Sequence, residues 1–474
     1  MTQRRKLLIA NEWVDAAEAI TVRSPHTGEV VGEVAKAGPA EMERAVQAAV
    51  RGFGETRKLS SIRRSEILTR AAAGLAKRKE EIARTITSEN AKTIKLSRGE
   101  VDRGIATFTI AAEEAKRIGG EVLPLDLNAQ SEGRLGLTRR FPLGPIFGIS
   151  PFNFPLNLVS HKVAPSMAAG NTLVLKPASS TPLSAILLGE ILLDAGMLPG
   201  TVNVVPCGAD LADKFVADPR FKLVTFTGSP GVGWDLKKKA GRKRVTLELG
   251  GNAAVIVEND ADLDLAVERA VTGSFAYSGQ VCISVQRIYL HEKIADAFTQ
   301  KFLERTKKLV MGDPFDEKTD IGPMIDEAAL TRTQAWVDEA AVGGASVLCG
   351  GKREGRYFPP TVITNVKPDM KVHCAEVFAP IVNLYQYRDF PAALAAVNDS
   401  PFGLQAGVFA RDVGRIFQAF ETLEVGGVIV NDVPTWRADS MPYGGEKDSG
   451  QGREGVRYAI EEMTQLRLLA LNLR

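Results

Sequence analysis

The stretch GPIFGI at residues 144–149 has the composition of a short buried β-strand, and a helical pattern follows it from about Pro155 to Ala169. The same alternation continues to Gly251. Further strands are predicted at residues 172–175, 202–205, 223–226 and 245–247, with a helix at residues 184–195. Strands and helices that alternate at this spacing indicate βαβ units around a parallel sheet, so the fold class is α/β.

A second alternation begins after Gly251. It comprises predicted strands at residues 253–257, 406–409 and 427–430, with a helix through Val267. We therefore expect a second α/β unit, joined to the first at Gly250-Gly251, and ligands often bind at such a boundary. The first 120 residues are predicted to be mostly helical, because residues 60–86 carry apolar side chains at helical spacing.

Two segments fit neither unit. Residues 121–142 are predicted to be extended and polar, and residues 466–471 form an apolar terminal strand. Exposed strand edges invite pairing with another chain, so a homo-oligomer, either a homodimer or a homotetramer, is expected.

Composition narrows the class of protein. A chain of 474 residues predicts two or three packed units, and its 59 basic and 57 acidic side chains nearly cancel. This balance favours neither a nucleic-acid partner nor a membrane surface. The four cysteines lack CxxC spacing, which predicts no metal site and no disulfide framework and favours a reducing compartment. The apolar run near the N-terminus is too short for a signal peptide. No stretch has the ~20 consecutive apolar residues that a membrane span needs, so we expect a cytoplasmic location.

Cys282 is the first candidate for chemistry. It lies in the glycine-flanked string SGQVCIS, and Glu248 in LELGG ends a predicted strand a short way upstream. A thiolate with a carboxylate base nearby is a recognised arrangement for nucleophilic catalysis. The alternative is a small buried hydrophobe, which is the usual state of a free cysteine.

Three further strings suggest binding groups. FTGSPGVG (residues 226–233) follows a strand and opens a helix, where backbone N–H groups bind phosphate well; its alternative is a plain glycine-rich turn. Lys176 ends a buried strand, where α/β sheets hold cofactors, although most lysines are exposed loop residues. Asn153 in PFNFP is suited to an oxyanion hole, and its alternative is a turn-forming asparagine.

Taken together, the chain resembles the aldehyde dehydrogenase superfamily over nearly its whole length. The strings that carry this resemblance are PFNFP, LVLKPAS, FTGSPGVG, LELGG, SGQVC, EVFAP (376–380) and PYGGEKDSGQGRE (442–454), in the family's order. The motifs look closest to lactaldehyde, non-phosphorylating glyceraldehyde-3-phosphate and phosphonoacetaldehyde dehydrogenases.

The resemblance implies an enzyme with three parts. These are a Rossmann-like NAD(P)-binding domain (residues 1–120 and 143–249), a catalytic α/β domain (250–447) and a small β oligomerisation element (121–142 and 460–474). The cofactor is NAD, NADP or both. The implied cofactor-binding residues are Lys176, Ser179, Gly228, Ser229, Gly250, Glu376 and Phe378.

The resemblance also implies a mechanism. Cys282 is the nucleophile and Glu248 the base that activates water, while Asn153 and the Cys282 N–H form the oxyanion hole; Lys162 and Glu454 link the base to solvent. An aldehyde is oxidised to its acid through a thiohemiacetal and a thioester. Two alternatives stay open: an enzyme that passes the acyl group to coenzyme A, which typically lacks a glutamate at position 248, and a catalytically silent homologue with a binding role.

Polar residues in the implied substrate tunnel favour a short hydroxylated or anionic aldehyde. The expected substrate-binding residues are Arg103, His161, Phe154, Arg437 and Tyr443. Each arginine has an alternative, which is a surface ion pair with Asp102 or Asp439. Val281 stands where phosphate-specific relatives carry arginine, which weakens the case for a phosphorylated substrate. Ser179 stands where strictly NAD-dependent relatives often carry glutamate, so use of both cofactors is expected.

Overall fold

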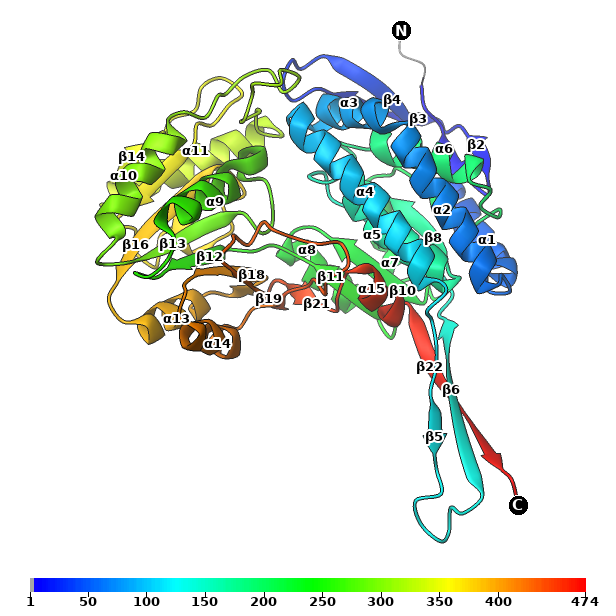
Figure 1. Ribbon diagram of the computed structural model, residues 1–474. Helices are drawn as coiled ribbons and strands as arrows, with labels where there is room; N and C mark the ends of the chain where they lie inside the picture. The colour runs from blue at the N-terminus through cyan, green and yellow to red at the C-terminus, as the bar shows by residue number, and fades with distance from the viewer. Residues whose placement is uncertain (1–3) are drawn as a thin grey trace.

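Two β-sheets organise the computed structural model, which describes residues 4–474, and a β arm extends away from both of them (Figure 1). The first sheet has eight strands. In spatial order these are β2 (Glu12–Val14), β1 (Leu7–Ile9), β9 (Val202–Val204), β8 (Thr172–Lys176), β7 (Pro145–Ile149), β10 (Leu223–Thr227), β11 (Arg244–Glu248) and β21 (Gly450–Gln451). The five strands from β9 to β11 are parallel, which confirms the predicted α/β class.

The edges of this sheet differ from a purely parallel arrangement. β1 pairs antiparallel with β2 and β9, and β21 pairs antiparallel with β11. These edge strands have two or three residues each, too few to give a periodic signal in the sequence. The first 120 residues are thus mostly helical, as expected, but they begin with strands, including the hairpin of β3 (Glu18–Arg23) and β4 (Val30–Lys36).

Helices cover both faces of the first sheet. One face packs against α1 (Pro39–Thr56), α7 (Ala209–Val216) and α8 (Pro230–Lys239). The other packs against α2 (Ser61–Lys77), α3 (Lys79–Asn90), α4 (Ile94–Glu114), α5 (Asn157–Ala169), α6 (Leu183–Asp194) and α15 (Val456–Glu462). α5 begins two residues later than predicted, because Glu100 Oε1 accepts the N–H groups of Leu156 (2.9 Å) and Asn157 (3.1 Å) and so caps the helix there.

The second sheet has seven strands. In spatial order these are β14 (Ser346–Cys349), β15 (Thr361–Thr364), β16 (Ile381–Tyr387), β13 (Val285–His291), β12 (Ala253–Val257), β18 (Gln405–Phe409) and β19 (Gly427–Val430). One face packs against α9 (Leu263–Phe275) and α10 (Ala295–Thr306), and the other against α13 (Phe390–Asn398) and α14 (Val413–Thr422). The helix predicted to run through Val267 extends to Phe275. The 3-10 helix η1 (Ala276–Gly279) follows α9 and leads to Cys282, while α11 (Glu327–Val342) and α12 (Lys371–Cys374) pack beside β15 and β16.

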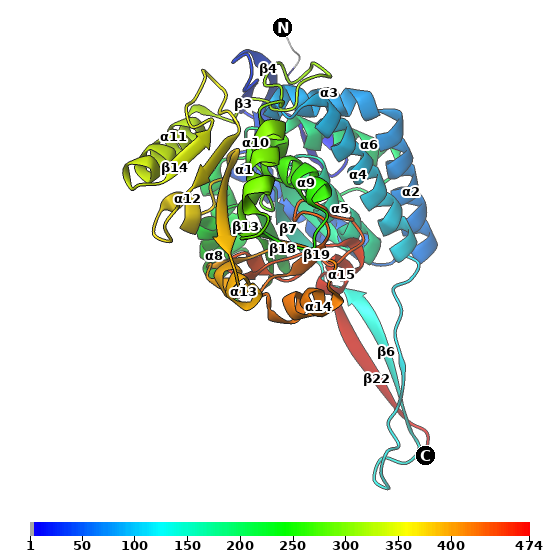
Figure 2. The same cartoon turned by 60° about the vertical axis from the view of Figure 1, so that its left-hand side comes forward.

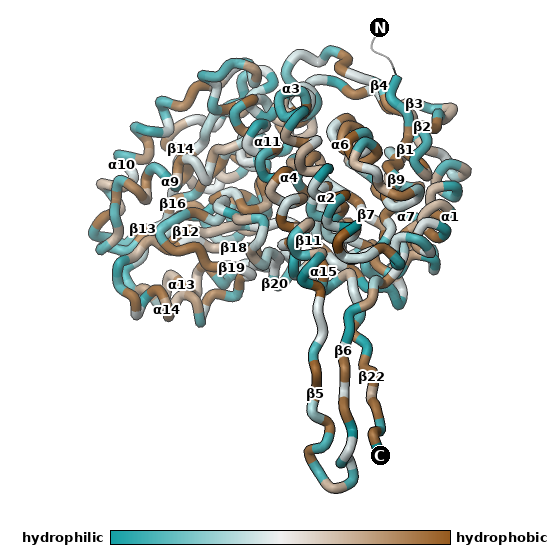
Figure 3. Tube along the Cα trace, turned by 45° about the vertical axis from the view of Figure 1, so that its right-hand side comes forward, coloured by the Kyte–Doolittle hydropathy of each residue, from teal (hydrophilic) through white to brown (hydrophobic). Residues whose placement is uncertain are grey.

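The arm is a three-stranded sheet of β22 (Thr464–Asn472), β6 (Arg134–Pro142) and β5 (Val122–Pro124). Figure 2 shows it extending well beyond the rest of the chain, and Figure 3 shows apolar residues along β22. Leu466, Leu468 and Leu469 are each more than half exposed there. A short pair, β17 (Phe402–Gly403) with β20 (Glu446–Lys447), completes the sheets. Within residues 4–474, no helix is both long and apolar enough to cross a membrane.

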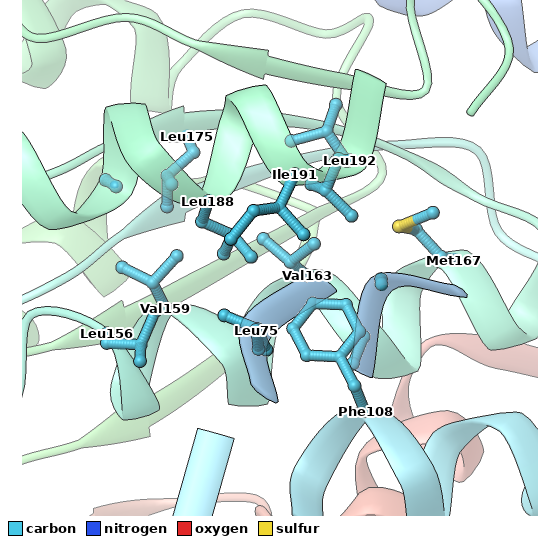
Figure 4. Close-up of a cluster of buried hydrophobic side chains, with 14 of the residues drawn as sticks. Leu75, Phe108, Leu156, Val159, Val163, Met167, Leu175, Leu188, Ile191 and Leu192 are labelled. Atoms are coloured by element: carbon cyan, nitrogen blue, oxygen red, sulfur yellow. The ribbon is translucent and has the colours of Figure 1, made fainter. Parts of the chain in front are cut away.

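Phe108 of α4 lies in the core between the first sheet and its helices, beside Leu75 and Val163 (Figure 4). Its side chain is fully buried. We expect Phe108→Ala to destabilise the chain by about 3–5 kcal/mol, because it removes a large apolar group and leaves a cavity. Thermal or denaturant unfolding measures this, with Leu127→Ala at an 81% exposed position as control. An unchanged unfolding midpoint in Phe108→Ala would contradict this account of the core.

Candidate active site

A cavity of about 400 Å³ brings together residues from both α/β units. Glu248 and Thr227, at the ends of β11 and β10, line it from the first sheet, and Cys282 lines it from the loop after η1. Parallel pairing places Thr227 opposite Glu248, so the two side chains share the carboxyl edge of the sheet. This is the edge where α/β sheets bind their ligands.

Cys282 follows a constrained segment of backbone. Tyr277 and Ser278 both have left-handed φ values, 50° and 53°, which non-glycine residues adopt only at a cost. Hydrogen bonds from their side chains hold this conformation: Tyr277 donates to Asn90 O (3.0 Å) and Ser278 to Gly322 O (2.7 Å). The conformation places the half-buried Cys282 on the cavity wall.

The thiol of Cys282 is protonated at rest. Burial raises the pKa of Cys282 to about 12, although a contact between Sγ and the Tyr443 hydroxyl (3.2 Å) opposes that rise. The thiol therefore needs a base to become a nucleophile.

Glu248 is suited to that role. Its side chain is 3% exposed, and neither carboxyl oxygen has a hydrogen-bond partner within the described part of the chain. Burial, reinforced by the negative charge of Glu454, raises the pKa of Glu248 well above its usual value. A buried carboxyl with a raised pKa is typical of a general base.

Lys162 and Glu454 form a buried pair behind Glu248. Lys162 Nζ lies 3.4 Å from Glu454 Oε1 and donates to the hydroxyls of Thr227 (2.7 Å) and Thr225 (3.1 Å). Burial alone would raise the pKa of Glu454, but the nearby charges, Lys162 above all, outweigh it and hold the pKa at about 2. Glu454 is thus ionised. Lys162 connects it to Thr227, the register neighbour of Glu248.

Asn153 lies against the loop that carries Cys282. Its Nδ2 donates to Gln280 O (3.1 Å), and the side chain is 4% exposed. One N–H of the amide group is therefore committed to the loop, and its second N–H is left for another acceptor. A direct role as an oxyanion-hole donor stays a prediction.

The predicted cofactor residues gather along the carboxyl edge of the first sheet. Lys176 ends β8, Gly228 follows β10, and Ser229 is the N-cap of α8. Near them, Glu376 Oε1 accepts the Gly251 N–H (3.0 Å), and a methyl group added at Gly250 would overlap the Glu376 carboxylate. This arrangement fits a dinucleotide, because it combines a helix N-terminus, a strand-end lysine and a close backbone approach that only glycine permits.

Two other predicted cofactor residues are placed less tightly. Phe378 has a left-handed φ of 51°, and its ring meets that of Phe152 edge-on at 5.9 Å. Ser179 is exposed, and its Oγ donates to Cys207 O (3.4 Å). Neither contact opposes a cofactor role, which stays a prediction for both.

Four of the five predicted substrate residues line the cavity: Arg103, Phe154, Arg437 and Tyr443. Arg103 NH2 lies 2.8 Å from Asp439 Oδ1, and Asp439 also lies 2.8 Å from His161 Nε2. The ion-pair alternative for Arg103 is therefore present, but it involves a buried carboxylate and leaves the arginine on the cavity wall. Asp102 instead pairs with Lys79. His161 is fully buried against Asp439, which makes it a support for the wall, and direct contact with substrate stays a prediction for it.

Arg437 is the second arginine of the wall. Its NH2 lies 3.3 Å from Glu454 Oε2, and its guanidinium stacks 3.6 Å from the centre of the Tyr443 ring. Arg437 and Tyr443 both line the cavity. They connect the predicted substrate end to Cys282 through the Tyr443 hydroxyl.

Sequence reasoning missed Lys92. It lies between α3 and α4, lines the cavity, and forms a fully buried ion pair with Glu100. Its Nζ lies 3.7 Å from the centre of the Phe154 ring and 4.8 Å from that of Tyr277, both favourable cation–π distances. No motif marks this lysine, and only its spatial neighbours reveal it.

The chain as a whole matches known proteins closely. A model of the aldehyde dehydrogenase family matches residues 13–469. The chain belongs to the aldehyde dehydrogenase family. It is 46% identical to a 3-sulfolactaldehyde dehydrogenase from Priestia aryabhattai, over 98% of each chain.

Two solved structures share the fold. One is aldehyde dehydrogenase 21 from Physcomitrella patens in complex with the reaction product succinate (TM-score 0.98, 45% identity, covering 100% of this chain and 99% of that one). The other is a glyceraldehyde-3-phosphate dehydrogenase from Methanocaldococcus jannaschii complexed with NADP (TM-score 0.92, 38% identity, covering 96% and 99%).

These similarities confirm four predictions made from the sequence. The family resemblance, the α/β fold class and the identification as an enzyme are correct. The enzyme is a dehydrogenase that uses NAD or NADP, as expected.

Gly250→Ala tests the proposed cofactor edge. The added methyl group would displace Glu376, so we expect the dissociation constant for NAD or NADP to rise about tenfold, a loss of about 1.4 kcal/mol. Fluorescence titration measures this without any turnover. Gly54→Ala in α1, where the methyl group meets open space, is the matched control. Equal affinity of the Gly250→Ala variant and the wild type for the cofactor would show that Glu376 does not contribute to cofactor binding.

Proposed function

We propose that this enzyme oxidises a short hydroxylated or anionic aldehyde to its carboxylic acid with NAD or NADP. The observation that carries the proposal is one cavity that holds Cys282 and Glu248 together with the cations Lys92, Arg103 and Arg437. The first two residues supply the chemistry of the reaction. The three cations supply a means of binding an anionic or hydroxylated substrate tail.

In the first half-reaction, Glu248 takes the proton of the Cys282 thiol, and the thiolate sulfur bonds to the aldehyde carbon. The resulting thiohemiacetal oxyanion receives hydrogen bonds from Asn153 Nδ2 and the Cys282 N–H. When bound, the cofactor would accept the hydride, and Lys176, Gly228, Ser229 and Glu376 would hold it. Loss of hydride from the thiohemiacetal leaves a thioester on Cys282.

In the second half-reaction, Glu248 takes a proton from a water molecule, which attacks the thioester carbon and releases the acid and the Cys282 thiolate. Before this step Glu248 passes its first proton toward solvent through Lys162 and Glu454. Both halves of the reaction therefore need a basic Glu248 carboxylate.

Hydrolysis is favoured over the two alternatives. Transfer to coenzyme A needs no water-activating carboxylate, yet Glu248 is present and both of its oxygens are unpartnered within residues 4–474. A silent binding protein has no need of a nucleophile and a base in the same cavity.

Glu248→Gln separates the two halves of the reaction. We expect a burst of NAD(P)H, slowed at neutral pH, followed by steady-state turnover at least about 100-fold below wild type, because the amide cannot activate water. In the wild type, the raised pKa of Glu248 means that a falling pH protonates the base and slows hydrolysis. The variant should lose this pH dependence.

Stopped-flow absorbance measures the burst, and Glu421→Gln on the exposed surface of α14 is the control. Full steady-state turnover in Glu248→Gln would contradict the hydrolytic role. Formation of an acyl-CoA on addition of coenzyme A would favour the acylating alternative.

The relatives support a substrate with an anionic tail. The Priestia aryabhattai enzyme acts on an aldehyde with a sulfonate, and the product bound to the Physcomitrella patens enzyme is a dicarboxylate. In this chain Asp439 and Glu454 orient Arg103 and Arg437 from behind, so their side chains are held in place. A preorganised arginine binds a carboxylate or sulfonate without a further loss of side-chain entropy.

Arg103→Gln tests this end of the cavity. We expect kcat/KM for 3-sulfolactaldehyde and succinic semialdehyde to fall about 10- to 100-fold, as expected for loss of a charged hydrogen bond of about 1.5–3 kcal/mol. The variant should oxidise propanal, which has no anionic or hydroxylated tail, as fast as the wild-type enzyme does. Arg98→Gln is the matched control, because Arg98 lies on the same helix and pairs with Glu80 and Glu317 at the surface. An equal effect on all aldehydes would exclude tail recognition by Arg103.

Cofactor choice extends the proposal. The Ser179 side chain bears no negative charge, and Lys176 ends the strand just before it. A 2′-phosphate therefore meets no repulsion at Ser179, so we propose that both cofactors are used, as comparison of their KM values would test.

We further propose that the arm joins copies of the chain into a homodimer or homotetramer. Its support is the exposed apolar edge of β22, which would otherwise face water (Figure 3).

The two sheets support a division of roles along the chain. We propose that cofactor binding belongs to residues 1–120 and 143–249, and catalysis to residues 250–447. The cytoplasmic location stays a prediction.

A further inference from the structure

The Tyr443 hydroxyl is the one side-chain group within the described residues that has a hydrogen-bond contact with the Cys282 sulfur. The two atoms lie 3.2 Å apart, well within hydrogen-bond range for sulfur. Tyr443 is 3% exposed. The family resemblance placed Tyr443 only among substrate-binding residues, and nothing about the PYGG string indicated that its hydroxyl faces the nucleophile.

The position of Tyr443 is fixed on both sides. Its backbone N–H donates to Glu454 O (3.1 Å), and the Glu454 N–H donates to Tyr443 O (2.6 Å). The Arg437 guanidinium covers its ring at 3.6 Å, and Glu454 Oε2 anchors that guanidinium at 3.3 Å. The hydroxyl is therefore held against the sulfur by a rigid frame and cannot swing away without breaking these contacts.

The direction of the hydrogen bond follows from the chemistry of the two groups. Burial raises the pKa of Tyr443 well above its usual value, so the hydroxyl stays protonated at working pH. A thiolate has no proton to donate and can only accept. The tyrosine is thus the donor whenever Cys282 is ionised, and a cation over the ring strengthens a phenol as a donor.

Other charges near the sulfur make this contact important. Glu376 and Glu248 disfavour a negative charge on Cys282, while Arg437 favours it. Burial opposes ionisation most strongly of all. Tyr443 is the one group that stabilises the thiolate by direct hydrogen bonding among the residues that the structure describes.

We propose that Tyr443 is a catalytic residue that donates a hydrogen bond to the Cys282 thiolate, with Arg437 stacked on its ring to strengthen it. The inference rests on the proposed function, in which Cys282 is the nucleophile. No bond to the tyrosine forms or breaks: the hydroxyl keeps its proton throughout, and the thiol proton goes to Glu248. The contribution is to lower the free energy of the ionised sulfur before it attacks the aldehyde.

Tyr443→Phe tests the proposal, because it removes the hydroxyl and keeps the ring under Arg437. The readout is the rate of Cys282 alkylation by iodoacetamide as a function of pH, without aldehyde or cofactor. Loss of a hydrogen bond to a charged group predicts that alkylation in the rising part of the profile falls about tenfold, with the profile displaced by about one pH unit to higher pH.

Tyr289→Phe is the matched control. Tyr289 is also buried and has the Arg287 guanidinium over its ring, but its hydroxyl donates to Ala396 O (3.2 Å) and it does not line the cavity that holds Cys282. Its alkylation profile should match the wild type. An unchanged profile in folded Tyr443→Phe, or an equal displacement in both variants, would overturn the proposal.

If Tyr443→Phe does not fold, incorporation of 3-fluorotyrosine at position 443 retains the hydroxyl and makes it more acidic. It should move the alkylation profile to lower pH, and no displacement would overturn the proposal. Because alkylation requires no substrate, this outcome is independent of turnover. A displaced profile in an enzyme that oxidises no short aldehyde would leave the role of Tyr443 intact and contradict the proposed function.

Discussion

The parallel pairing of β10 with β11 is the constraint on which the site depends. It sets Thr227 beside Glu248 at the carboxyl edge of the first sheet, and the loop after η1 places Cys282 on the same cavity. Neither unit holds the pair alone. The base belongs to the first sheet and the sulfur to the second unit, so packing of the two units assembles the chemistry.

Burial then determines the state of both groups. It raises the pKa of Cys282 to about 12, so the thiol is protonated before reaction, and it raises the pKa of Glu248 well above its usual value, so the carboxylate is a stronger base than an exposed one. Transfer of the thiol proton to the carboxylate requires groups that favour the ion formed. Arg437 and Tyr443 supply them at the sulfur, and Lys162 with Glu454 connects the carboxyl toward solvent. The cations of the cavity are each paired with a carboxylate, which orients them and favours their charged form, although burial lowers the pKa of Lys92.

Much of this could be predicted from the sequence, because parallel strands leave continuous apolar runs that end at functional residues. Lys176 and Glu248 were located in this way, and their positions at the ends of β8 and β11 agree. β1 and β21 could not be predicted, since two or three residues carry no period. Sequence reasoning missed Lys92 and considered Asp439 only as a surface partner, for another reason: an isolated charged residue is exposed in most proteins. Only contacts from distant parts of the chain, such as Phe154 with Lys92 and Arg103 with Asp439, show that these residues are buried. The same holds for the Tyr443 hydroxyl, whose contact with the sulfur spans 161 positions.

Covalent bonding of substrate to Cys282 is the central claim, and rapid acid quench during turnover tests it most directly. The enzyme is mixed with succinic semialdehyde and NADP, quenched within the first turnover, digested and mapped by mass spectrometry. The account predicts an acyl group on the peptide that contains Cys282, and unmodified peptides for Cys207, Cys349 and Cys374. Rapid turnover with the Cys282 peptide unmodified at every time point, or turnover in Cys282→Ser, would contradict it.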